Sequence, residues 1–158
     1  MVECVIGRVA KSPTLVETMS VAKSKSFLFV CKDNDCRSQM AEGFARSMAT
    51  GTVKVFSAGV KPKGLNQYAV DVMNELGIDI SEQETRKFTD VPVNKVDTVV
   101  TLSSDSDPLP TKLNKKATQI HWPLTDPMSA DGSDAEVKKA FRSVRDEIRN
   151  RVQVLLVG

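Results

Sequence analysis

The chain lacks the residue types and apolar segments that several classes of protein require. It has a single histidine and three cysteines, and no apolar run approaches the ~18–20 residues that cross a membrane. One histidine, with cysteines that lack a metal-binding spacing, predicts no metal site. An odd cysteine count excludes a complete disulfide framework and indicates a reducing compartment, for which we expect the cytoplasm. A net charge of only +2 gives no electrostatic reason to expect nucleic acid or a membrane surface as a partner.

What remains is the composition of one globular domain. The 158 residues are 41% hydrophobic and 27% charged, which are ordinary values. Residues 1–24 differ, because they carry several basic residues, Ser and Thr but few acids. We expect a flexible extension, for which Met19 is an alternative start; a targeting segment is the less favoured alternative. Residues 25–158 are then the folded domain, and Cys4 in the extension has no assigned role.

Strands and helices alternate along this domain. Asn66 can cap a helix that Gly77 ends, and Ser133 with Glu136 three residues later forms a capping box for the last helix. On that last helix we expect a solvated face that includes Arg145. The expected strands are 26–30, 53–57, 96–102 and 118–122, and the main helices are 39–46, 67–76 and 133–155, with a short one at 91–96. This order predicts an α/β fold, with a four-stranded, mostly parallel sheet flanked by helices on both faces in three layers, as in Rossmann-like proteins.

The most informative segment runs from Cys31 to Ser38 with the sequence CKDNDCRS, between the first strand and the first helix. Five residues between Cys31 and Arg37 can wrap so that their backbone N–H groups point inward, and the helix behind adds its positive end. Such a loop binds a tetrahedral oxyanion. Its field is expected to favour the Cys31 thiolate, the nucleophile, while Arg37 grips two oxygens of the anion.

A second acidic group is expected at the same edge of the sheet. Asp126 follows the fourth strand and precedes a proline. Because parallel strands end at one edge, where open α/β sheets bind ligands, the topology brings Asp126 to the Cys31 loop. A carboxyl beside a bound dianion keeps its proton to higher pH, which suits a general acid.

These motifs resemble the low-molecular-weight protein-tyrosine phosphatase superfamily, and the SQMAEG continuation after Arg37 most resembles its arsenate reductases. Further matches follow in the same order and cover about residues 25–156. They are VFSAG at 55–59, LGIDIS at 76–81, HWPLTDP at 121–127 and FRSVRDEI at 141–148.

The resemblance implies a role for each residue of the loop. Cys31 is the nucleophile, Arg37 the oxyanion clamp and Asp126 the proton donor. Asn34 holds the loop shape, and Ser38 donates a hydrogen bond to the thiolate. The remaining loop residues support the anion-binding backbone; they are Lys32, Asp33, Asp35 and Cys36.

The chain departs from the family at four places. Asp33 stands where Gly is frequent, and Asp35 adds a second carboxylate, so either one turned inward would weaken anion binding. Met128 and Ser129 replace the tyrosines that follow Asp-Pro in many tyrosine phosphatases, which weakens the case for a phosphotyrosine substrate. Some family members hold a monovalent cation near the loop, but the acidic residue that completes that site aligns with Arg86, so we expect no cation or metal.

The fourth departure concerns cysteines. Thioredoxin-linked arsenate reductases of this fold carry two more cysteines after the third strand, and here Ser103 stands at the first of these positions with no cysteine following. The resolving thiol must come from elsewhere. It is a small thiol such as glutathione with a glutaredoxin-type partner, or Cys36, which we favour as a reversible disulfide partner that protects Cys31.

Three functions stay open at this point. The first is a thiol-dependent arsenate reductase with no bound cofactor. The second is a phosphatase that hydrolyses phosphate monoesters through a phosphocysteine. The third is a non-catalytic oxyanion-binding module, which Asp33 and Asp35 would suit.

Overall fold

The computed structural model describes residues 25–103 and 112–157, so the expected extension at 1–24 lies outside the described residues. Four strands form one sheet in the order β2-β1-β3-β4, and each neighbouring pair is parallel. The strands are β1 (Ser26–Val30), β2 (Lys54–Ala58), β3 (Thr98–Thr101) and β4 (Thr118–His121). The helices are α3 (Arg37–Met48), α4 (Gln67–Asn74) and α5 (Asp134–Val157), with short 3₁₀ helices η1 (Phe88–Asp90), η2 (Val93–Lys95) and η3 (Pro127–Ser129). The expected α/β fold with a parallel sheet is confirmed.

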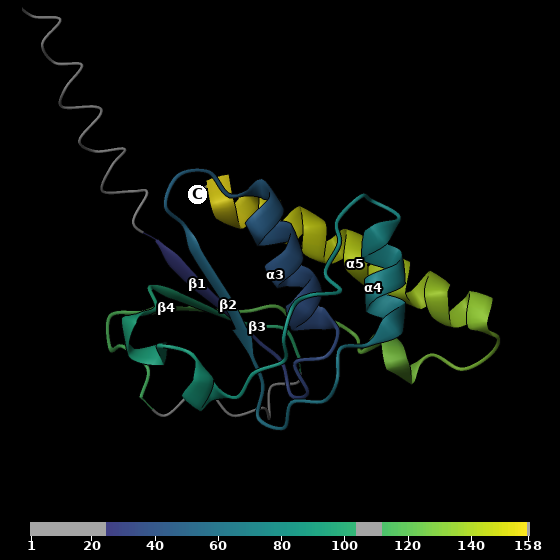
Figure 1. Cartoon of the computed structure of the whole chain (residues 1–158), viewed down its shortest axis with the longest axis horizontal. Helices are drawn as coiled ribbons and strands as arrows, with labels where there is room; N and C mark the ends of the chain where they lie inside the picture. The colour runs from purple at the N-terminus through teal and green to yellow at the C-terminus, as the bar shows by residue number, and fades with distance from the viewer. Residues whose placement is uncertain (1–24, 104–111, 158) are drawn as a thin grey trace, which may run out of the picture.

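The two faces of the sheet are covered differently. In the described residues, α3, α4 and α5 lie together on one face, where α5 crosses behind α3 and α4 (Figure 1). The opposite face carries a smaller apolar cluster that contains Val91 and Val96 and packs with side chains of η1 and η2. The layers therefore follow the expectation, but on the second face the helices are single 3₁₀ turns.

Local signals explain where the helices begin and end. The Asn66 side chain accepts hydrogen bonds from the N–H groups of Tyr68 and Ala69, so it caps α4 as predicted. Gly77 has a φ of +77°, the left-handed conformation that ends a helix. At the start of α5, the Ser133 hydroxyl accepts from the N–H of Glu136, which is one half of the expected capping box.

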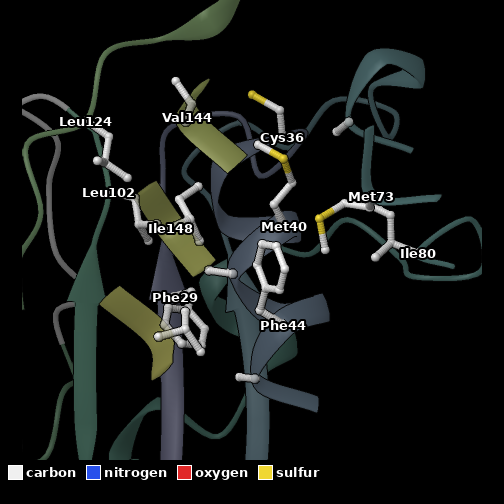
Figure 2. Packing of buried hydrophobic residues seen from close by; sticks show 14 of the residues in the cluster. Phe29, Cys36, Met40, Phe44, Met73, Ile80, Leu102, Leu124, Val144 and Ile148 are labelled. Atoms are coloured by element: carbon white, nitrogen blue, oxygen red, sulfur yellow. The ribbon is translucent and has the colours of Figure 1, made fainter. Parts of the chain in front are cut away.

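The main core lies between the sheet and the three α-helices. Phe29 from β1, Met40 and Phe44 from α3 and Ile148 from α5 are fully buried in it (Figure 2). Since both faces of the sheet are covered, β1 is buried along its whole length, as a central strand of a parallel sheet must be. This burial fixes the end of β1, from which the Cys31 loop starts.

The expectation that Arg145 lies on a solvated face of the last helix is wrong. Arg145 is only 7% exposed. Its guanidinium donates to the Val72 carbonyl and to the carboxylates of Glu75 and Asp146. Periodicity alone placed it among the charged residues of α5, but two of its three partners, Val72 and Glu75, lie on α4 and at its C-terminal end, which the periodicity of one helix cannot show.

Among the helices of the described residues, none combines the length and the apolar character that a membrane-spanning helix needs.

Candidate active site

The Cys31 loop turns between the end of β1 and the start of α3, at the carboxyl edge of the sheet. Its carbonyl groups face outward. The N–H groups of Lys61, Lys63 and Asn66 donate to the carbonyls of Lys32, Asp33 and Asp35 at 3.0, 2.9 and 3.0 Å. With its carbonyls bound to the neighbouring segment, the loop can turn its N–H groups to the inside, as an anion site requires.

Asn34 holds the loop in an unusual backbone conformation. Its φ of 50° is the only positive value of a non-glycine residue in the described chain. The side chain is buried and donates from Nδ2 to the Ser38 hydroxyl at 2.8 Å, and Ser38 Oγ lies 2.9 Å from Cys31 Sγ. The structure therefore brings together the three residues to which the resemblance assigned the thiolate and its support.

Burial changes the expectation for Cys31. The side chain is 1% exposed, and this burial raises the pKa of the Cys31 thiol above its ordinary value. The Ser38 hydroxyl, the N–H groups of Ser38 and Asn34 and the positive charge of Arg37 act in the opposite direction. The sequence predicted a net preference for the thiolate, because it shows the donors of the loop but not how completely the fold removes the sulfur from water.

Arg37, the first residue of α3, is also buried. Its Nη1 donates to the carbonyls of Leu102 and Leu124 at 3.3 and 3.0 Å, which orients the guanidinium. Its Nε is buried and has no hydrogen-bond partner within the described residues. A buried donor without a partner is costly, so the Nε edge of Arg37 is prepared for an acceptor such as one oxygen of an oxyanion.

Asp126 reaches the loop from the other side, as the topology predicted. One oxygen, Oδ2, lies 3.8 Å from Nη2 of Arg37, and the other accepts from the N–H of Met128 at 3.0 Å. The side chain is about half exposed, at 48%. Asp126 is thus oriented by η3 and open to solvent, which suits exchange of a proton with a bound oxyanion.

The two loop carboxylates have different environments. Asp33 Oδ2 lies 3.4 Å from the ammonium of Lys63, so this carboxylate is paired with a cation of the neighbouring segment. Asp35 is partly buried, and burial raises the pKa of its carboxyl group, against a hydrogen bond from Cys36. Lys32 is exposed. The charge of Asp33 is therefore partly offset, and Asp35 keeps its proton to higher pH than an ordinary aspartate.

Cys36 belongs to the apolar core. It is 2% exposed and its sulfur lies near Met40, at the top of the core cluster (Figure 2). Both Cys31 and Cys36 are free thiols. Burial, and next the negative charge of Asp35, raise the pKa of Cys36 strongly. A thiol with so little thiolate is a weak attacking group, which argues against Cys36 as the resolving thiol.

Arg86, the residue expected to prevent cation binding, has its guanidinium near the carboxylate of Glu42. The buried carboxylate of Glu42 accepts from the Ser57 hydroxyl at 2.5 Å and from Nε of Arg46 at 2.9 Å. Nη1 of Arg86 lies 3.8 Å from the same carboxylate. Two arginines thus balance the charge of Glu42.

Several residues that shape the site were missed by sequence reasoning. A Cβ at Gly59 would lie 2.7 Å from the carbonyl oxygens of Cys31 and Lys32, so only glycine lets this segment approach the loop. The carbonyls of Leu102 and Leu124 orient Arg37, and the side chain of Gln39 contacts Asn34. For Gly59, the available sequence signal was a glycine directly after a strand. The backbone carbonyls of Leu102 and Leu124 leave no signal in the sequence.

Comparison with known proteins points the same way. Residues 26–157 match the model of the low molecular weight phosphotyrosine protein phosphatase family. An arsenate reductase of Halalkalibacterium halodurans is 42% identical over 130 residues, which are 82% of this chain and 93% of that protein. One of Bacillus subtilis is 40% identical over 131 residues, which are 83% of this chain and 94% of that protein.

Solved structures agree. A structure of an arsenate reductase in the phosphate binding state superimposes with a TM-score of 0.74 at 34% identity, covering 84% of this chain and 97% of that one. An arsenate reductase from Archaeoglobus fulgidus gives a TM-score of 0.68 at 29% identity, covering 84% and 99%. The match to the family model spans nearly all of the described residues and includes every candidate site residue. This chain belongs to the low molecular weight phosphotyrosine protein phosphatase family, as the resemblance of its motifs predicted.

Proposed function

We propose that this protein reduces arsenate to arsenite, with Cys31 as the nucleophile and a thiol from outside the chain as the reductant. The observation that carries the proposal is Arg37, whose buried Nε has no partner within the described residues and whose charge acts on Cys31. A prepared cationic donor beside a thiol is what attack by sulfur on an oxyanion requires. The arsenate reductases among the relatives support arsenate as that oxyanion.

The first step joins sulfur to arsenic. The loop N–H groups and the Nε edge of Arg37 bind three oxygens of arsenate and draw its charge toward the base of the cradle. Once Arg37 binds the anion, its positive charge stabilises the Cys31 thiolate less. The Ser38 hydroxyl and the N–H groups of the loop then provide the remaining stabilisation of the thiolate. The thiolate attacks arsenic, a Cys31 S–As bond forms, and one As–O bond breaks. Asp126 gives its proton to that oxygen, which leaves as water.

The second step transfers two electrons. An external thiolate attacks Cys31 Sγ, the S–As bond breaks, and its electron pair stays on arsenic. Arsenic passes from the pentavalent to the trivalent state and leaves as arsenite, while the two sulfurs form a mixed disulfide. A second external thiol attacks that disulfide and restores Cys31, so one pair of thiols is oxidised for each arsenate reduced. No bound cofactor takes part in this sequence.

The reductant is the part of the proposal that most concerns this chain. Sequence positions 103–111 contain no cysteine, and Cys36 is held in the core with a strongly raised pKa. Both facts support a thiol that arrives from solution, such as glutathione with a glutaredoxin-type partner. A catalytic thiol that must stay reduced also supports the cytoplasm as the place of the reaction.

A phosphatase is the second candidate, and the family itself favours it. In the first step the Cys31 thiolate attacks phosphorus of a phosphate monoester, an S–P bond forms and the P–O bond to the ester oxygen breaks. Asp126 protonates that oxygen, which leaves as the alcohol. A water molecule, activated by Asp126, would then attack phosphorus, break the S–P bond and release phosphate. Electrons are not transferred, so the requirement for thiols separates the two functions.

The experiment measures arsenite formed from arsenate by the purified protein, with glutathione plus glutaredoxin and with thioredoxin in parallel. The blank is Cys31→Ser, which should lose turnover but still bind phosphate or sulfate. Cys36→Ala is the matched variant, since the proposal expects it to keep turnover with an external thiol. Arsenite from the glutathione system alone establishes a reductase with a borrowed thiol. Absence of arsenite with every donor overturns the proposal; hydrolysis of p-nitrophenyl phosphate would then establish the phosphatase, and tight anion binding without turnover the binding module.

A further inference from the structure

A chain of buried side-chain amides leads from the segment after α4 to the nucleophile. Gln39, the third residue of α3, has no exposed surface. Its Nε2 donates to the backbone carbonyls of Asn34 and Glu84, both at 3.0 Å, and lies 3.2 Å from Asn34 Oδ1. Its Oε1 accepts from Nε2 of Gln83 at 2.8 Å. Every polar atom of the Gln39 side chain is therefore used, although Gln39 lies too deep to touch a substrate.

The backbone groups at the ends of this chain decide which way each amide points. A carbonyl can only accept, so the carbonyls of Glu84 and Asn34 require the NH₂ group of Gln39 on their side. A backbone N–H can only donate, and that of Arg86 donates to Asn34 Oδ1 at 2.7 Å. The orientation of both amides follows from these contacts.

The orientation of Asn34 then sets the direction of the hydrogen bond at the thiol. With Oδ1 turned toward Arg86 and Gln39, the NH₂ group of Asn34 faces Ser38 and donates to its hydroxyl oxygen. The Ser38 hydroxyl hydrogen is then left for Cys31 Sγ, 2.9 Å away. A donor aimed at sulfur favours the charged thiolate, while an acceptor would favour the neutral thiol.

We propose that Gln39, held by Gln83 and Glu84, is a positioning residue that keeps the Ser38 hydroxyl donating to Cys31 and so stabilises the thiolate form of the nucleophile. This inference rests on Cys31 being the nucleophile, as proposed above. Gln39 acts through Asn34 and Ser38 and touches neither substrate nor sulfur. The segment at residues 83–86, about 50 positions further along the chain, thus takes part in tuning the reactive thiol.

A test of this series of amides should replace uncharged side chains only, so that the charged groups near the Cys31 thiol stay unchanged. Arg37 on α3 acts on Cys31, and Asp126 contacts Arg37 from the loop after β4. The suitable variants are Gln39→Met, which keeps the side-chain length and removes all four contacts, and Gln83→Met, which removes only the donor to Gln39. Both are uncharged changes. Gln67→Met on α4 is the matched control, because Gln67 is exposed and its amide donates to Asp71, outside this network.

The measurement is the rate at which iodoacetamide alkylates Cys31 across pH, read by mass spectrometry of the Cys31 peptide in the full-length protein. Gln39→Met should move the midpoint of the rate profile upward and slow alkylation at neutral pH on the order of tenfold. Gln83→Met should move the midpoint in the same direction by a smaller amount. Ser38→Ala removes the donor to Cys31 itself, so its shift is the largest expected from this series of hydrogen bonds. Gln67→Met should match the wild type.

Profiles of Gln39→Met and Gln83→Met that coincide with the wild-type profile would overturn the proposal, even if both variants melt at lower temperature, because a purely structural role lowers stability without moving the midpoint. If Gln39→Met does not fold, Gln83→Met alone decides in the same way. Alkylation needs neither arsenate nor a thiol donor, so its result is independent of whether the protein reduces arsenate.

Discussion

Two charged regions of the molecule, the Cys31 loop and the contact between α4 and α5, use their arginines in opposite ways. At the helix contact, Glu75 binds Arg142 and Arg145 at 2.8 Å each, and Arg145 also binds a carbonyl and Asp146. At the loop, Arg37 is about as buried as Arg145, but its Nε has no partner within the described residues, and its carboxylate neighbour Asp126 lies 3.8 Å away.

The titrating groups show the same contrast. Hydrogen bonds from Arg142, and then those from Arg145, lower the pKa of Glu75 to about 2. Burial raises the pKa of Cys31 and Asp35 at the loop. The helix contact is satisfied within the protein and stabilises the fold, whereas the loop keeps a buried donor, Nε of Arg37, without a partner among the described residues. The difference teaches that an unpaired buried donor marks the site for chemistry better than a count of charges does.

The largest effect is expected for Arg37→Lys. A lysine has one ammonium group, which cannot hold the carbonyls of Leu102 and Leu124 and present a second nitrogen to the anion. We expect kcat/KM for arsenate to fall on the order of 100- to 1,000-fold. The same change at the satisfied region, Arg142→Lys, should leave kcat/KM within about twofold. Equal losses in the two variants would erase the contrast between the regions.

Gly59→Ala is expected to be next. The added methyl would meet the Cys31 and Lys32 carbonyls at 2.7 Å, so the loop or β2 must shift. A misplacement of the nucleophile costs up to about 100-fold in rate, and the crowding about 1–3 kcal/mol in stability. Gly64→Ala is the control, because nothing lies within 4 Å of a Cβ there. Activity assays with urea titrations check both numbers; an active Gly59→Ala would show that the loop tolerates movement.

Arg145→Met tests the satisfied region. It leaves the Val72 carbonyl and the Glu75 carboxylate without one donor each. We expect a loss of about 1–3 kcal/mol in the free energy of unfolding, measured by urea titration, with kcat/KM of the folded protein unchanged. Arg149→Met, at an exposed position of the same helix, should have little effect on stability. A large drop in kcat/KM for Arg145→Met would mean that the two regions are coupled.

The pH dependence of stability should separate the regions by sign. Glu75 has a lowered pKa, so its contribution is fully present above its ordinary pKa of about 4.5 and is lost as pH falls toward 2. Asp35 has a raised pKa, so its contribution to the free energy of unfolding is present at low pH, below the ordinary pKa of an aspartate. It is lost as pH rises through the raised pKa of the folded protein. Urea midpoints should show that Glu75→Gln flattens the acid limb, while Asp35→Asn stabilises at neutral pH. Identical profiles for the two variants would contradict the assigned shifts.

The smallest effect is expected for Glu147→Gln on α5. Glu147 pairs with Arg151 at 3.4 Å, and both side chains are more than a third exposed. An exposed pair one helical turn apart is worth about 0.3–0.5 kcal/mol. A thermal melt should place this variant close to the wild type, which sets the scale for the ion pairs of the buried Arg145. A loss comparable to that of Arg145→Met would show that burial does not distinguish these pairs.

Much of the architecture was predictable because it depends on neighbours in the chain. The Asn66 cap, the Gly77 stop and the order of strands and helices follow from contacts within a few residues and from the handedness of parallel connections. The loop between Cys31 and Ser38 was recognisable because its residue types and their spacing are local in the chain, although the segment at 61–66 also holds its carbonyls. Asp126 was placed correctly because strand order alone brings it to that edge.

The tertiary structure decided what depends on distant partners and on exclusion of water. Arg37 finds its orienting carbonyls 65 and 87 positions away, and Gln39 finds Glu84 across 45. The burial of Arg145 and the raised pKa of Cys31 likewise have no local signature, and the close approach of Gly59 had only a glycine after a strand as its signal. The sequence by itself determined the fold class, the position of the Cys31 loop and its candidate nucleophile. Only the packed structure decided how dry the thiol is and which donors are left free, because desolvation is a property of all the surrounding elements together.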